Sequence, residues 1–252
     1  MCYDELKQRF TDEVFKEEKN HKVALEKAYA DMSRRATGHN PQMKTDCLNW
    51  FDNKKIFESA LNCKTQEEFD EWHKETCQKL KEIQKDFGRM GRSQKVINMA
   101  FKYLSCVDDT YDAILPFCHM TLDGYTLNWY KTIIDKEEQK KLTEWSKISD
   151  YEKEYYPIQE KIREYLKEDH KYSICIGEET TKKFDIPKIP FQAEFIIWEG
   201  EIIKDKYKTI IKQLNNYKTK GKKKDNWLIG NLFDDYLRSY LDPFSKKQEI
   251  VK

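Results

Sequence analysis

The apolar positions along most of the chain recur with the period of an α-helix. Between residues 3 and 36 they are spaced mainly by three and four among many charged residues, which predicts amphipathic helices. Asn20 is a candidate break within this stretch. Gly38 and Pro41 predict its end, because Gly favours the position after a helix and Pro prevents continuation. The apolar positions are Leu6, Phe10, Val14, Leu25, Tyr29 and Met32.

The clearest helical pattern runs from Thr65 to Gly88. Thr65 is a good N-cap and Glu68 completes a capping box, while Gly88 favours termination. The expected buried stripe is Phe69, Trp72, Leu80, Ile83 and Phe87. A second helix should start near Ser93 and continue to about Cys106. Its expected buried residues are Val96, Ile97, Ala100, Phe101 and Leu104.

The rest of the chain also contains mainly helical patterns. Residues 107–121 form a long connection, and residues 171–190 lack a helical period, so two short strands or an ordered loop are both consistent with them. Residues 217–225 are a basic linker. Further helices are expected over 43–53, 54–62, 123–134, 135–146, from Asp150 with Pro157 as a kink or fresh start, over 190–216 with a candidate break at Gly200, and over 226–241.

The composition agrees with a mostly helical fold. Gly and Pro together account for only 14 of 252 residues, whereas charged residues reach 36%. A β-rich protein of this size needs more turn residues, and long helices with solvated faces account for the charge. We therefore expect an all-α or mostly α fold in one compact domain, 1–252, with 1–106 and 107–252 as candidate lobes.

Charge and cysteine content restrict the functional classes. The formal net charge of +1 argues against broad charge-driven binding to nucleic acid, although a local basic patch is compatible with it. The seven cysteines include no C-x-x-C pair, which is typical of a reducing compartment. Apolar runs such as FIIW at 195–198 are too short to span a bilayer. No signal peptide or cofactor motif is visible, so we expect a cytoplasmic protein without membrane association.

A glycine-bearing stretch, GRMGRSQK at residues 88–95, combines cations with a helix start. Gly88 and Gly91 could expose backbone N–H groups, and Arg89, Arg92 and Lys95 could surround an anion there. The spacing matches neither the phosphate-binding loop nor the dinucleotide fingerprint. The alternative is a corner between two helices, with both glycines chosen for backbone conformation.

A second candidate is Asp123, which follows the irregular segment and precedes a predicted helix. An Asp at this position commonly serves as an N-cap that accepts backbone hydrogen bonds. The functional alternative is a carboxylate held at the mouth of a cleft.

Taken together, Gly88, Gly91, Lys95 and Asp123 resemble the helix-hairpin-helix DNA glycosylases over residues 85–130. In that family a hairpin contacts the DNA backbone through main-chain N–H groups, the next helix can carry a lysine nucleophile, and a downstream Asp assists catalysis. This chain has F-G-R-M-G in place of the family's usual hairpin, Thr-Leu before the Asp, and no iron–sulfur cysteine cluster.

The resemblance implies an enzyme that flips a damaged base out of the duplex into an aromatic-lined pocket. Lys95 would then attack the sugar carbon, and Asp123 would stabilise the positive charge that develops on the sugar. Without lysine attack, Asp123 alone could activate water. A relative that only binds DNA is also compatible. The main alternative is a non-enzymatic interaction protein, or one that binds a small anion or nucleotide at residues 88–95.

Two more stretches could contact nucleic acid. Arg34 and His39 form R-x4-H, which resembles the active-site motif of HEPN ribonucleases, an all-helical family in which His serves in acid–base cleavage. Lys222 and Lys223, followed by Trp227, could contact phosphate while the indole stacks on a base. The alternatives are an exposed helix end and a solvated linker.

Metal binding and acid catalysis have weaker sequence support. Two His–Cys pairs could in principle hold zinc, but nothing in the sequence brings them together and buried cysteines usually act as small hydrophobes, so no metal site is predicted. Three glutamates near Trp198 could include an acid with a perturbed pKa, although a lysine partner is the more common arrangement. These residues are His73, Cys77, Cys118 and His119, and Glu194, Glu199 and Glu201.

Overall fold

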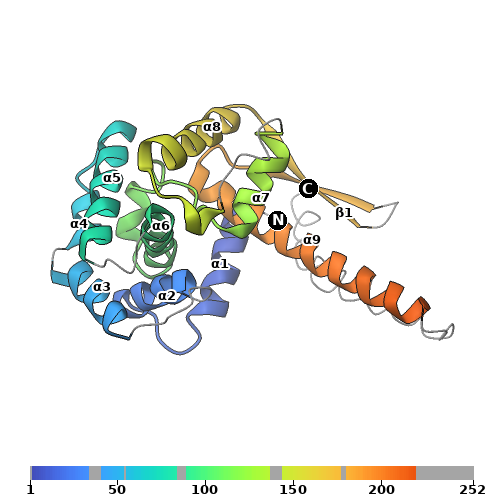
Figure 1. Ribbon diagram of the computed structural model, residues 1–252, viewed down its shortest axis with the longest axis horizontal. Helices are drawn as coiled ribbons and strands as arrows, with labels where there is room; N and C mark the ends of the chain where they lie inside the picture. Colours follow the sequence, from blue (N-terminus) through green and yellow to red (C-terminus); the bar gives the residue numbers. More distant parts are fainter. Residues whose placement is uncertain are drawn as a thin grey trace, which may run out of the picture.

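The computed structural model describes residues 2–33, 41–53, 55–83, 89–136, 144–176 and 180–219. Within these ranges the fold is mostly helical, as predicted, with one small antiparallel sheet (Figure 1). The α-helices are α1 (Tyr3–Val14), α2 (His21–Ser33), α3 (Pro41–Asn53), α4 (Ile56–Ala60), α5 (Gln66–Ile83), α6 (Met90–Val107), α7 (Gly124–Ile133), α8 (Tyr156–Leu166) and α9 (Pro190–Thr219). Three short turns are η1 (Asp109–Ala113) and η2 (Trp145–Lys147), both 3-10, and the π-helical η3 (Tyr151–Tyr155).

Helix α6 is the centre of the molecule. Figure 1 shows it among the other helices, and it contacts α1, α2, α5 and all three short turns. Fifteen of its 18 residues are buried, so α6 is covered on nearly every side. The predicted core positions are confirmed: Val96, Ile97, Ala100, Phe101 and Leu104 are all inaccessible or nearly so.

Local signals set several helix boundaries as predicted. The Asn20 side chain accepts a hydrogen bond from the Val23 N–H at 2.9 Å, which separates α1 from α2. The Thr65 hydroxyl accepts one from the Glu68 N–H at 3.2 Å. The Glu68 carboxylate, however, accepts from the Lys64 N–H and not from that of Thr65, so the capping box is displaced by one residue.

Two predicted boundaries were wrong. Helix α6 begins at Met90, not near Ser93, and α9 continues through Gly200 without a break. In both cases a neighbouring group packs so closely against the glycine that a larger residue would clash with it. A Cβ at Gly91 would lie 1.8 Å from the Trp145 carbonyl oxygen, and one at Gly200 would lie 2.1 Å from the Tyr172 ring. Each glycine therefore admits a neighbouring group to the surface of a continuous helix.

The segment expected to be strands or a loop contains a β-hairpin. Strand β1 (His170–Ile176) pairs antiparallel with β2 (Thr180–Ile186), with His170 opposite Ile186. The hairpin contacts α9 and extends beside it from the helical body (Figure 1). Just before it, Pro157 lies in the first turn of α8, which follows directly on η3.

Several predicted features lie outside the described residues. They are Arg34, His39, Phe87, Gly88, Lys222, Lys223, Trp227, nearly all of the linker 217–225 and the helix 226–241. The helix predicted over 135–146 is described only at its ends, and its last residues belong to η2.

Candidate functional site

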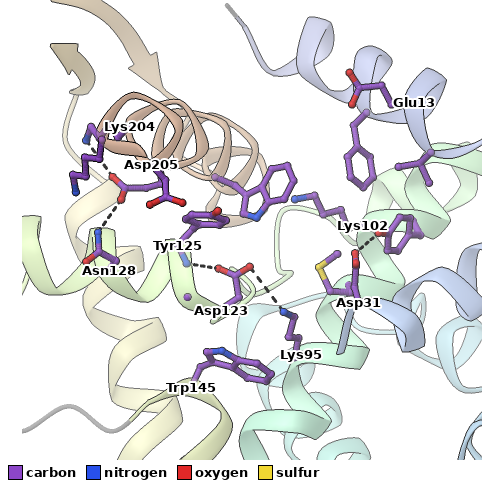
Figure 2. Close-up of a pocket in the computed structure, with 18 residues that line it drawn as sticks. Glu13, Asp31, Lys95, Lys102, Asp123, Tyr125, Asn128, Trp145, Lys204 and Asp205 are labelled. Carbon is purple, nitrogen blue, oxygen red and sulfur yellow. Dashed lines mark hydrogen bonds and ion pairs between the residues drawn. The ribbon is translucent and has the colours of Figure 1, made fainter. Parts of the chain in front are cut away.

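A large open pocket lies between α1, α6, the start of α7, η2 and α9. Its volume is about 580 Å³, which is within the usual range for small-molecule sites. Aromatic side chains form much of the wall, and both acidic and basic groups project into it (Figure 2). The aromatic residues are Phe10, Tyr103, Tyr125, Trp145 and Trp198.

The two residues predicted to be catalytic, Lys95 and Asp123, meet in this pocket. Lys95 Nζ lies 4.0 Å from Asp123 Oδ2, and the two side chains are 11% and 14% exposed. Figure 2 shows the side chains pointing toward each other from α6 and from the start of α7. The Lys95 ammonium also lies 4.6 Å from the centre of the Trp145 ring, a distance that favours a cation–π interaction.

Asp123 is both a helix cap and a wall of the pocket. Its Oδ1 accepts hydrogen bonds from the N–H groups of Tyr125 and Thr126 at 2.8 and 3.1 Å, and the Thr126 hydroxyl accepts one from the Asp123 N–H. These bonds hold the carboxylate in one orientation and leave Oδ2 facing Lys95. The N-cap interpretation and the cleft interpretation of Asp123 therefore describe two oxygens of the same group.

The other predicted anion-binding residues do not surround Lys95. The Gly91 N–H donates to the Ile148 carbonyl at 3.0 Å, so it is engaged within the protein. Arg89 is the exposed N-cap of α6, and Arg92 lies near Tyr29. Among the residues from Arg89 to Lys95, only Lys95 lines the pocket.

A buried ion pair, missed by the sequence analysis, borders the same pocket. Lys102 Nζ lies 2.8 Å from Glu194 Oε1, and both side chains are almost inaccessible. The ammonium also lies over the rings of Phe195 and Trp198, at 4.3 and 5.1 Å. Glu194 thus has a lysine partner, which is the arrangement that the sequence favoured, but the identity of that lysine and its burial could not be foreseen.

At the α9 end of the pocket, Glu201 collects three donors. Its carboxylate accepts hydrogen bonds from the Tyr172 hydroxyl at 2.6 Å, from Asn128 Nδ2 at 2.8 Å and from Lys204 Nζ at 3.1 Å. Burial and the Glu201 carboxylate raise the pKa of Tyr172, so this phenol remains a donor. The interaction ties the β-hairpin and α7 to α9.

The candidate zinc ligands belong to a buried hydrogen-bond network instead. The rings of His73 and His119 lie 4.5 Å apart, but their nitrogens bond to Asn98, Tyr151, Tyr155 and Asp70. Burial raises the pKa of the Cys77 and Cys118 thiols, which favours the neutral thiol over the metal-binding thiolate. Among the described residues, no group of three or more His, Cys, Asp or Glu side chains could hold a metal ion.

Comparisons with protein-family models, curated proteins and solved structures found no match. No helix in the described part of the chain has the length and apolar character needed to cross a bilayer.

Proposed function

We propose that the chain is a nucleic-acid-acting enzyme of the DNA-glycosylase type, with Lys95 as nucleophile and Asp123 as its acidic partner. The observation that carries the proposal is that these two residues, 28 positions apart in sequence, converge in one open pocket (Figure 2). A lysine and a carboxylate from different helices, both at a cavity wall, are the groups that such chemistry requires.

The rest of the pocket also suits a flipped base. Tyr125, Trp145 and Trp198 offer aromatic surfaces, and stacking on such surfaces is a common way to hold an extruded base. The cavity of about 580 Å³ has room for a nucleoside. The alternative, an anion held by residues 88–95, is supported less, because the Gly91 N–H already donates to Ile148.

The chemical step assigns a role to each group. An amine is nucleophilic only without its extra proton, so Lys95 first passes a proton to Asp123, which lies 4.0 Å away. The nitrogen lone pair then bonds to the anomeric carbon, the glycosidic bond breaks, and its electron pair leaves with the base. The departing base takes the proton that Asp123 holds. A proton then moves from the Lys95 nitrogen to the ring oxygen, the bond between that oxygen and the anomeric carbon breaks, and the nitrogen lone pair forms a protonated imine on Lys95.

Borohydride trapping tests this proposal. Purified protein would be incubated with duplexes that carry damaged bases or abasic sites, and borohydride would reduce the imine to a stable amine link. We expect a covalent adduct that disappears in Lys95→Gln and falls sharply in Asp123→Asn. Lys79→Gln is the matched control, because Lys79 is exposed on α5. Absence of an adduct and of strand cleavage with every duplex would refute the enzymatic proposal; binding without reaction would indicate a DNA-binding relative.

A further inference from the structure

Residues 118–123, which lead into α7 and end at Asp123, have no helix or strand of their own. Backbone groups of Met120, Thr121 and Leu122 bond instead to buried side chains from α8, α9 and α6. Gln159 pairs with both backbone groups of Met120, at 3.2 and 2.8 Å. The Thr121 N–H donates to Glu194 Oε2 at 2.7 Å. Because a buried backbone amide left without a partner is strongly unfavourable, these side chains determine the path of the segment.

Of these three side chains, Gln94 bonds to the residue nearest Asp123. Its Nε2 donates to the Leu122 carbonyl at 2.9 Å, and its Oε1 accepts from the Leu122 N–H at 3.3 Å. Gln94 is adjacent to Lys95 in sequence, and Leu122 is adjacent to Asp123. One side-chain amide therefore joins the backbone next to the amine to the backbone next to the carboxylate.

Gln94 is itself held in a single orientation. Its Nε2 also donates to the Gly91 carbonyl at 2.9 Å, and its Oε1 accepts from Asn98 Nδ2 at 3.1 Å. The side chain is completely buried. Both polar atoms have two partners each, so rotation of the amide would break four hydrogen bonds at once.

The network continues from Asn98 to η3 and to the segment before α7. Asn98 Nδ2 also donates to the Tyr155 hydroxyl at 3.0 Å, and that hydroxyl contacts His119 Nδ1 at 3.0 Å. His119 Nε2 lies 2.6 Å from Asp70, which also accepts from Arg163. Because Asp70 can only accept, His119 carries its proton on Nε2, and Tyr155 donates to Nδ1. Each hydrogen bond from Asn98 to Asp70 therefore has one donor and one acceptor.

We propose that Gln94 is the positioning residue that sets the separation between Lys95 and Asp123. Its role in catalysis rests on the proposed function, but its control of the geometry does not. A misplacement of about 1 Å between reacting groups can lower a rate roughly 100-fold. Loss of the amide should therefore reduce turnover while leaving substrate binding nearly unchanged.

The test replaces Gln94 with Met, which keeps the length of the side chain and removes the amide. Gln159→Met is the matched control, because it removes the same kind of amide from Met120, away from Asp123 in the bonding pattern. We expect Gln94→Met to lower kcat for adduct formation by about 10- to 100-fold with KM within roughly twofold. Gln159→Met should have a smaller effect on kcat.

A second measurement does not depend on activity. Lysines would be labelled by reductive ¹³C-methylation, and the Lys95 signal, assigned by its loss in Lys95→Arg, would be followed against pH. When Gln94 is present, Asp123→Asn should shift the titration midpoint of Lys95 relative to that of the wild-type protein. In the Gln94→Met background the same substitution should have little effect, whereas in the Gln159→Met background its effect should persist.

The two proposals fail in different ways. If wild-type protein forms no adduct but the Lys95 coupling depends on Gln94, the enzymatic proposal fails and the positioning role stands. If Asp123→Asn shifts Lys95 equally with and without Gln94, the positioning role is overturned. Should Gln94→Met not fold, Gln94→Glu retains the acceptor for the Leu122 N–H and loses the donor. It should weaken the coupling, and an undiminished coupling in this variant would overturn the proposal as well.

Discussion

The Lys102–Glu194 ion pair should make a large contribution to stability that depends on both partners being present. The two side chains are only 2% and 3% exposed and their charged atoms lie 2.8 Å apart. Lys102→Met removes the cation but retains a flexible apolar chain against the rings of Phe195 and Trp198. The Glu194 carboxylate would then remain buried without its cation, although it would still accept the hydrogen bond from the Thr121 N–H.

Breaking a buried pair by removing one partner typically costs about 3–5 kcal/mol. For a protein of this size, 1 kcal/mol corresponds to about 2–4 °C in Tm, so Lys102→Met should lower Tm by roughly 6–20 °C. The double variant Lys102→Met/Glu194→Gln should recover most of this loss. The Gln oxygen still accepts from Thr121, and no unpaired charge remains.

The assay is denaturant unfolding of the wild type, both single variants and the double variant, with Tm as a second readout. Lys79→Met is the control for loss of an exposed lysine, with an expected cost below about 1 kcal/mol because its pair with Glu75 is solvent-exposed. The reasoning is refuted if Lys102→Met costs less than about 1 kcal/mol. It is also refuted if the double variant loses as much as the two single variants combined.

Three further substitutions or conditions give outcomes of defined sign. Helix propensity alone predicts a gain of about 1 kcal/mol for Gly91→Ala, but the close Trp145 carbonyl predicts a lower Tm, and a higher Tm would contradict this contact. Gly200→Ala should destabilise the wild type but be neutral or stabilising in a Tyr172→Ala background, because the clashing ring is then gone; equal losses in both backgrounds would count against the contact. Burial, and then the neighbouring His119, hold the pKa of His73 well below its ordinary value, and burial also lowers that of His119. As the pH falls, the histidines of the unfolded state therefore take up protons before those of the folded state. The free energy of unfolding should be at its full value above about pH 6.5, and below that pH it should decrease by up to about 1.4 kcal/mol per pH unit for each histidine. Unfolding free energies that stay constant from pH 7 to pH 5 would contradict that assignment.

Features that depend on short-range signals could be predicted from the sequence. The break at Asn20, the Thr65 cap and the apolar stripe of α6 each depend on residues within a few positions of one another. Asp123 was recognised as a cap for the same reason. The pairing of Lys95 with Asp123 was inferred from a resemblance, and the distance between them required the folded structure.

The buried polar residues of α6 could not be predicted from periodicity. Gln94, Asn98 and Lys102 follow one another at intervals of four, a spacing that normally indicates a solvated face. In this fold α6 is surrounded, so that face meets Leu122, Tyr155 and Glu194 instead of water. For a similar reason Gly91 was placed before the start of a helix and Gly200 at a candidate break, since the groups that approach these glycines come from distant parts of the chain.

The enclosure of α6 also determines which half of the site can move. Amide hydrogens of a helix buried on nearly all sides exchange with solvent only through large-scale opening, and Lys95 belongs to this helix. Asp123 follows a segment whose backbone amides at Met120, Thr121 and Leu122 bond to side chains and not to a regular ladder. Loss of the Gln94 bonds to Leu122 should therefore displace the carboxylate relative to a stationary amine.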